Sequence, residues 1–211
     1  MKKVLQDYTR EEIAALVEAC GEKKYRAQQL YTGLMQGKKI SELPLPAAFR
    51  EKLLFEYEDE PIKIREIFSS REDGTKKFLF ELADGNLIEG VLMQYKYGAT
   101  QCVSTQVGCR MGCNFCASTL GGLIRNLSAG EILAQILTVN RLQGGTSEKR
   151  AVKNVVLMGS GEPFDNYDAV VRFLRNATAE EGFGMSIRNV SLSTCGLVPA
   201  MKRFADEGLP L

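Results

Sequence analysis

The chain has 211 residues, of which 45% are hydrophobic and 25% are charged, an ordinary balance for a globular protein with a buried core. Its formal net charge of +1 excludes a strong overall field for nucleic acid, so an RNA partner would need local basic clusters such as Lys23, Lys24 and Arg26. The sequence has no apolar run of about 18 residues and no secretory leader, which predicts a cytoplasmic protein with reduced cysteines and no membrane partner.

Helical patterns occupy the first part of the chain. Thr9 and Glu12 form a capping box, in which the hydroxyl and the carboxylate each satisfy a free backbone N–H. Apolar residues then recur with helical spacing at Ile13, Leu16, Val17 and Cys20. Two further helices are predicted at residues 26–36 and 47–57, so we expect residues 1–60 to form a small helical domain.

From residue 61 the apolar period changes to two, which is typical of strands. Strands are predicted at residues 62–67, 77–82 and 87–93. Asp-Gly pairs at 73–74 and 84–85 favour the tight turns that join antiparallel strands. The sequence therefore predicts a β-meander over residues 61–98.

From residue 99 strand and helix patterns alternate. Strands are predicted at 101–107, 154–158 and 189–194, and helices at 128–142, 167–175 and 198–207. Three consecutive βα units predict an α/β fold with a parallel sheet, and functional groups gather at the carboxyl-terminal edge of such sheets. Cys109, Glu162 and Ser193 all fall at that edge. Residues 206–211 resemble a helix end that leads into a fourth strand, so we expect the front part of a longer protein; an open module and an associating half-barrel are the alternatives.

Three cysteines, Cys109, Cys113 and Cys116, form a C-x-x-x-C-x-x-C motif after the first of these strands. Three thiolates on one short loop can hold an iron–sulfur cube and leave one iron free to chelate a small molecule. The motif is similar to that of the radical S-adenosylmethionine (SAM) enzymes. Phe115 is expected to form an apolar wall that shields the cluster from water.

A zinc site and a buried thiol cluster are the plainer alternatives for these cysteines. Zinc normally takes four ligands in proteins, often as two Cys pairs or as Cys with His. The chain has no histidine, and its other cysteines are Cys20, Cys102 and Cys195, of which Cys20 is expected in the helical core. Because the expected partners for zinc are missing, the sequence favours an iron–sulfur cluster.

Several other polar residues stand where they can take part in chemistry. Gly161 allows a tight turn after the second βα strand, and Glu162 can accept hydrogen bonds from an ammonium group, although such a turn is more often a plain βα loop. The Ser193 hydroxyl can bind a nucleoside or simply satisfy the end of its strand. Glu89 is either a solvent-facing strand residue or a proton acceptor, and Cys102 is either a buried thiol or a redox thiol. The residues alone leave these alternatives open.

Taken together, the motifs resemble the RlmN family, bacterial radical SAM enzymes that methylate C2 of adenine in 23S rRNA and tRNA. The matching segments run in the family's order, at residues 89–92, 102–109, 113–119, 125–127, 158–163 and 191–199. Residues 21–30 look like the small helical RNA-binding domain of that family. The resemblance covers essentially the whole chain, and it implies that residues 99–211 form a partial, truncated radical SAM barrel of about three of the six βα units.

The resemblance also implies roles for particular residues. A [4Fe-4S] cluster would be held by Cys109, Cys113 and Cys116, and SAM would be bound by Gly161, Glu162 and Ser193. An electron donor such as flavodoxin or ferredoxin would reduce the cluster, and cleavage of SAM would give a 5′-deoxyadenosyl radical. A methyl group carried on a cysteine beyond this chain would then reach the adenine. Cys102 would resolve the covalent adduct through a transient disulfide, and Glu89 would accept a proton.

Two other functions share these motifs. A related family methylates C8 of adenine in 23S rRNA with the same cluster and SAM motifs, and a truncated RNA-binding remnant would have lost the chemistry. No cysteine follows Cys195, so the methyl-carrying cysteine of the family does not lie in this chain. By itself we expect the chain to assemble a cluster poorly or not at all, and not to complete methylation.

Overall fold

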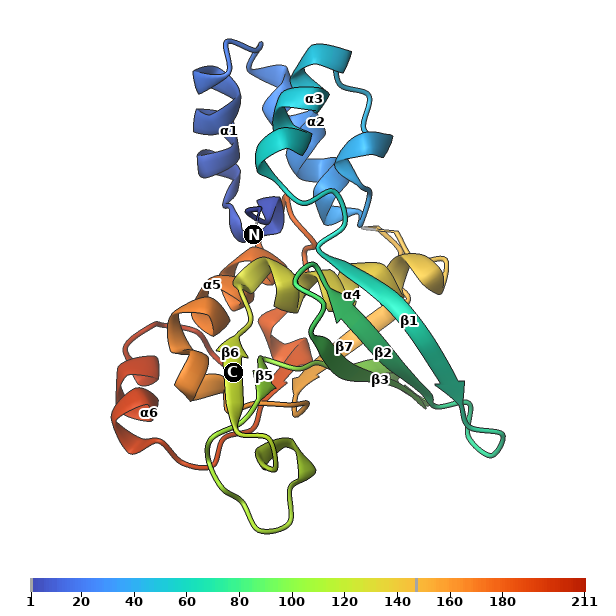
Figure 1. The fold of residues 1–211 in the computed structure, drawn as a ribbon, viewed down its shortest axis with the longest axis vertical. Coiled ribbons are helices and arrows are strands. Elements are labelled where there is room, and N and C mark those ends of the chain that lie inside the picture. Colours follow the sequence, from blue (N-terminus) through green and yellow to red (C-terminus); the bar gives the residue numbers. More distant parts are fainter. Residues whose placement is uncertain (1, 147) are drawn as a thin grey trace.

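A computed structural model describes residues 2–146 and 148–211, and it shows a helical unit set on a mixed sheet (Figure 1). The helical unit consists of α1 Arg10–Ala19, α2 Tyr25–Met35 and α3 Ala47–Glu56, with the 3₁₀ helices η1 Leu5–Asp7 and η2 Ile40–Glu42. The predicted capping box is present, because Thr9 Oγ1 accepts a hydrogen bond from Glu12 N at 3.3 Å and Glu12 Oε2 accepts one from Thr9 N at 2.8 Å. The core of the unit contains the predicted apolar residues Leu30, Tyr31, Leu34 and Met35.

A six-stranded sheet forms the centre of the molecule, in the order β1-β2-β3-β4-β7-β8. Its strands are β1 Ile62–Ser69, β2 Lys76–Leu82, β3 Leu87–Tyr95, β4 Gly98–Cys102, β7 Val152–Leu157 and β8 Val190–Leu192. The first four strands are antiparallel neighbours, whereas β4, β7 and β8 run parallel. The predicted α/β class is confirmed, and the meander is hydrogen-bonded directly to the parallel strands.

The parallel part of the sheet is accompanied by α4 Ala129–Leu142, α5 Tyr167–Thr178 and α6 Val198–Ala205, and by the 3₁₀ turns η3 Ala117–Thr119, η4 Pro163–Asn166 and η5 Ile187–Asn189. No helix in residues 2–146 or 148–211 combines the length and the hydropathy that a membrane crossing requires.

One face of the sheet is covered by these helices and the other is open. Gln101 in β4 is fully buried and donates a hydrogen bond from Nε2 to Gln135 O of α4 at 2.9 Å. Because side chains alternate along a strand, the next residue, Cys102, points to the opposite face. Its neighbours there are the half-buried Val156 of β7 and, beyond it, the exposed Ser191 of β8. Within the described residues this second face is therefore open to solvent.

Two bidentate ion pairs join the helical unit to the helices of the sheet. Arg172 in α5 donates to the two carboxylate oxygens of Glu12 at 2.8 and 2.9 Å. Arg141 in α4 donates to both oxygens of Glu42, in η2, at 2.7 and 3.0 Å. Such forked pairs favour one direction as well as one distance, and they link α1 and η2 to α5 and α4.

The prediction of one strand over residues 101–107 is wrong, because the chain forms two strands there. β4 ends at Cys102, and β5 Gln106–Gly108 pairs with β6 Leu123–Asn126 in a separate two-stranded sheet. Between β4 and β5 the backbone turns to the loop after β7, where Gly159 N donates to Val103 O at 3.0 Å. These long-range partners outweigh the local strand pattern.

Gln135 satisfies the backbone at this break and gives a test of it. Its buried side chain accepts a hydrogen bond from Ser104 N at 3.0 Å and donates one to Ser104 O at 2.9 Å. Gln135→Leu keeps the volume but leaves both backbone groups unpaired, so we expect the free energy of unfolding to fall by about 2–4 kcal/mol in urea denaturation. The matched change Gln28→Leu, at an exposed position of α2, should cost less than about 0.5 kcal/mol. Equal losses for the two variants would contradict this account.

Candidate active site

The three-cysteine motif lies in the loop that joins β5 and β6, which reaches away from the body of the molecule at the bottom of the view in Figure 1. The base of the loop is closed by Cys109 N, which donates to Gly122 O at 3.0 Å. Gly108 has a φ of +75°, and a Cβ there would collide with the same carbonyl oxygen. Only glycine therefore fits directly before the first cysteine.

The donor set of this loop fits an iron–sulfur cube. All three motif cysteines are free thiols; Cys109 is buried, whereas Cys113 and Cys116 are half-buried. In the part of the chain that the structure describes, no three Cys, His, Asp or Glu side chains are placed as ligands of a single metal ion. A cube does not need that placement, because each thiolate binds a different iron at a separate corner. Three reduced thiols on one loop match a cube with one open iron.

The expectation that Phe115 forms an apolar wall is wrong. Its side chain is 94% exposed, and Leu120 in the same loop is also exposed. The tip of the loop lacks neighbours, since a Cβ added at Gly112 would meet nothing within 4 Å. Apolar character favours burial, but at this tip the described residues offer Phe115 no surface to pack against.

The loop after β7 carries Glu162, whose side chain is almost completely buried. Its Oε1 accepts hydrogen bonds from Phe164 N at 3.0 Å and Thr194 Oγ1 at 2.6 Å, and its Oε2 accepts one from Cys195 N at 2.8 Å. These bonds draw the following chain away from β8, so the strand predicted at 189–194 is only 3 residues long. A carboxylate has about four acceptor positions, so these three donors leave one, and the Cys195 thiol is the group beside it.

Sequence reasoning missed Gln106, which holds this loop in place. Its buried side chain accepts a hydrogen bond from Glu162 N at 2.8 Å through Oε1. Its Nε2 donates to Asn126 Oδ1 at 2.7 Å and to Asp165 Oδ2 at 2.9 Å. Gly161 lies directly against it, because an added Cβ would be 2.6 Å from the Cβ of Gln106. No clear sequence signal marks Gln106, because the preceding residues Ser104 and Thr105 are polar as well.

The loop after β8 completes this edge of the sheet. Ser191, Ser193 and Cys195 are all exposed, as strand alternation predicts. Partial desolvation, a hydrogen bond to Glu162 and the negative charge of that carboxylate raise the pKa of Cys195 to about 11, and Cys113 adds to the effect. The cysteine loop and the loops after β7 and β8 therefore meet at the carboxyl-terminal edge of the parallel strands.

Glu89 and Cys102 lie on the open face of the sheet. Val91 pairs with Cys102 across β3 and β4, and Glu89 is two residues from Val91, so the three side chains share that face. Glu89 is exposed, and its Oε1 lies 3.0 Å from Lys77 Nζ. Cys102 is half-buried, and burial raises the pKa of its thiol, which keeps the thiol protonated at neutral pH.

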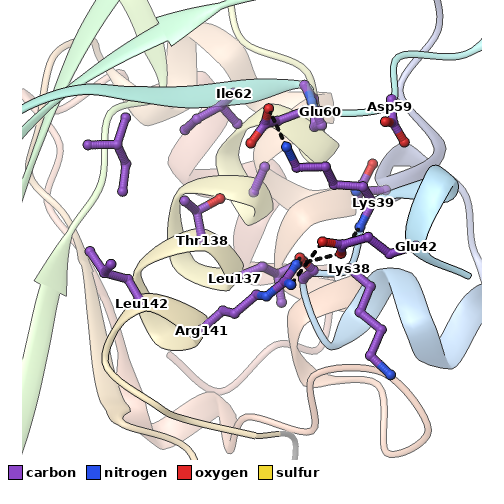
Figure 2. Close-up of a pocket in the computed structure, with 15 residues that line it drawn as sticks. Lys38, Lys39, Glu42, Asp59, Glu60, Ile62, Leu137, Thr138, Arg141 and Leu142 are labelled. Atoms are coloured by element: carbon purple, nitrogen blue, oxygen red, sulfur yellow. Dashed lines mark hydrogen bonds and ion pairs between the residues drawn. The ribbon is translucent and has the colours of Figure 1, made fainter.

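A separate cavity of about 490 Å³ lies between η2, β1 and α4. Figure 2 shows two ion pairs at its rim, Arg141 with Glu42 and Lys39 with Glu60, the latter at 2.8 Å. None of the predicted site residues lines this cavity. It lies where the helical unit meets the sheet.

Alkylation of Cys195 tests whether its thiol meets Glu162. Because the carboxylate opposes formation of the thiolate, the rate with iodoacetamide should reach half its maximum only near pH 11, rather than near the ordinary value of 9.0. Peptide mass spectrometry after brief exposure of the metal-free protein measures this profile. Glu162→Ala should move the midpoint down towards the ordinary value, and a midpoint near that value in both proteins would contradict the contact.

The Radical SAM superfamily matches residues 103–211 of this chain, about half of its length. The chain is 46% identical over 213 residues to the "Probable dual-specificity RNA methyltransferase RlmN" of Clostridium botulinum strain Alaska E43, covering 100% of this chain and 60% of that protein. The protein of the same name from Lachnoclostridium phytofermentans is 46% identical over 206 residues, covering 96% of this chain and 56% of that protein. The crystal structure of a radical SAM methyltransferase from Sphaerobacter thermophilus matches with a TM-score of 0.91 at 37% identity, covering 99% of this chain and 62% of that one.

The chain thus spans about 60% of the length of the curated relatives that it matches. Their similarity confirms the resemblance to the RlmN family that the motifs predict, and the solved structure confirms the predicted partial barrel. Through the match over residues 103–211, which contains the three-cysteine loop and Glu162, the chain belongs to the radical SAM superfamily.

Proposed function

We propose that this protein, expressed from its complete reading frame, is a radical SAM RNA methyltransferase that methylates C2 of adenine in 23S rRNA and tRNA. The observation that carries the proposal is that the three-cysteine loop contacts the turn that carries Glu162, through Arg110 with Asp165 and Ser118 with Ser160. The C2 carbon of adenine is not nucleophilic, so polar methyl transfer would fail and a radical route is needed. The printed name of the relatives, a dual-specificity RNA methyltransferase, supports two kinds of RNA substrate.

The cysteine loop and the Glu162 loop would share the cofactors. The [4Fe-4S] cluster would be held by Cys109, Cys113 and Cys116, and SAM by Gly161, Glu162 and Ser193. When bound, the cluster and SAM supply a 5′-deoxyadenosyl radical, with an electron from a donor such as flavodoxin or ferredoxin. An N–H of the SAM ammonium group would replace the Cys195 thiol at the fourth acceptor position of Glu162. The missing Cβ of Gly161 keeps this loop against Gln106.

Residues on the open face would complete the reaction. Cys102, once deprotonated, would attack the sulfur of a carrier cysteine, so that an S–S bond forms as the sulfur–carbon bond to the RNA adduct breaks. The electron pair of the broken bond and a proton go to the methyl carbon. Before that step, the methylene radical of the carrier cysteine would add to C2, Glu89 would accept the C2 proton, and the unpaired electron would leave to the reduced-cluster couple that supplied it. The placement of Cys102 on the same face of the sheet as Glu89 supports this division of roles.

The helical unit would hold the RNA, because a target base must leave its stack to reach the radical. Lys23 and Lys24 are exposed at the start of α2, beside Tyr25, which is 53% exposed. Arg26 is instead paired with Glu22 at 2.7 Å. Free ammonium groups beside an exposed aromatic ring suit contacts to phosphates and stacking on an unpaired base.

Anaerobic reconstitution tests the cluster. The protein from the complete reading frame should bind about four iron and four sulfide ions per chain, as a cube requires. Cys109→Ser, Cys113→Ser and Cys116→Ser should each lose most of this iron. Cys20→Ser is the matched control, because Cys20 packs half-buried against the core of the helical unit, and it should keep the full iron content. Equal iron in all four variants would contradict the ligand assignment.

Analysis of the RNA product tests the reaction. After incubation with SAM and a reductant, digested 23S rRNA and tRNA should contain 2-methyladenosine, measured by liquid chromatography and mass spectrometry. Cys102→Ser should leave a covalent protein–RNA adduct that survives a denaturing gel. 8-Methyladenosine as the product, or RNA binding without any cleavage of SAM, would overturn the proposal.

A further inference from the structure

The first turn of the cysteine loop is pinned by an ion pair that lies outside the predicted site. Arg110, which directly follows Cys109, donates from Nε to Asp165 Oδ2 at 3.0 Å and from Nη2 to Asp165 Oδ1 at 2.5 Å. Asp165 belongs to η4, and its backbone N–H donates to Glu162 O at 3.0 Å. The pair therefore joins the residue beside the first sulfur to the turn that carries Glu162.

This pair is built differently from an ordinary surface contact. The side chain of Asp165 is only 8% exposed, whereas that of Arg110 is 63% exposed. Asp165 also accepts a hydrogen bond from the buried Gln106. A nearly buried carboxylate is costly without charged donors, and two parallel bonds from one guanidinium fix direction as well as distance. The pair therefore imposes a geometry on the loop.

The remainder of the loop depends on few contacts. Ser118 Oγ lies 3.2 Å from Ser160 Oγ and tethers the second half of the loop to the same β7 loop. Between the two tethers, around Gly112 and Phe115, the chain meets open space, and Figure 1 shows the loop projecting from the molecule. The positions of the sulfurs relative to Glu162 therefore follow from where the loop is pinned.

We propose that Arg110 and Asp165 are a positioning pair, which fixes the cysteine loop against the Glu162 turn so that SAM chelated at the open iron meets Glu162. The placing of SAM rests on the proposed function. The clamp, by which we mean the attachment of the cysteine loop to the Glu162 turn by this ion pair, is a property of the metal-free chain. Arg110 acts through the backbone of the loop. Without it the loop stays attached at its β5–β6 base and at Ser118, so the cluster still forms but is held less firmly.

Hydrogen–deuterium exchange of the metal-free complete protein tests the clamp. Arg110→Met should speed exchange at the hydrogen-bonded amides of Cys109, Cys116 and Gly122 by about three- to tenfold and leave β7 unchanged. Arg110→Lys keeps the charge but loses the fork, so it should fall between Arg110→Met and the wild type.

Arg175→Met is the matched control for these variants. Arg175 is 59% exposed and pairs with Glu207 at 2.7 Å, an ion pair between α5 and the end of α6. Its loss should leave exchange in the cysteine loop unchanged. A concentrated salt solution, of about 1 M, should shrink the difference between Arg110→Met and wild type, because the guanidinium is reached by solvent.

The loaded protein gives a second readout. Iron should pass to a chelator about three- to tenfold faster from Arg110→Met than from wild type, and the change in the electron paramagnetic resonance spectrum on adding SAM should weaken. Wild-type protein that binds no iron would overturn the proposed function. Hydrogen–deuterium exchange in the metal-free chain would still show whether Arg110 attaches the cysteine loop to the Glu162 turn. Wild-type behaviour of Arg110→Met in exchange, iron loss and spectrum would overturn the positioning pair.

Discussion

The buried carboxylate of Glu162 is the interaction on which the arrangement of the site depends. Burying a carboxylate is costly unless donors surround it, and the chain supplies them from Phe164 in its own loop and from Thr194 and Cys195 after β8. Gln106 in β5, the strand that leads into the cysteine loop, joins this arrangement because its amide oxygen accepts a hydrogen bond from the backbone N–H of Glu162. Parallel strands bring these loops to one edge of the sheet, and the hydrogen bonds of one carboxylate decide how they meet.

The parts of the fold that follow from local patterns could be predicted. The capping box at Thr9 places the start of α1, because both partners of the box lie within one turn. Ile64 and Ile67 are three residues apart, an irregular spacing for a strand, yet both belong to β1. A bulge between Ile64 and Glu66 restores the alternation, so the two isoleucines share a face of the sheet.

The parts that depend on distant partners could not be predicted. Arg110 and Asp165 are 55 residues apart in sequence, and no local pattern links them. The break between β4 and β5 likewise arises from bonds to the β7 loop and to Gln135, which compete successfully with a good strand pattern. Phe115 shows the converse, since its apolar side chain favours burial but the described part of the chain places nothing over it. The residue types of a site can thus be found in the sequence, whereas the long-range contacts that hold them in place are seen only in the folded structure.

The two bidentate pairs link the helical unit to α4 and α5 in the sheet-bearing part of the molecule. If the helical unit binds RNA as proposed, these links help to set the distance between its RNA-binding surface and the carboxyl-terminal edge of the parallel strands. A fixed distance would favour an RNA whose target adenine lies at the matching distance from the segment bound by the helical unit, whatever the bases between them.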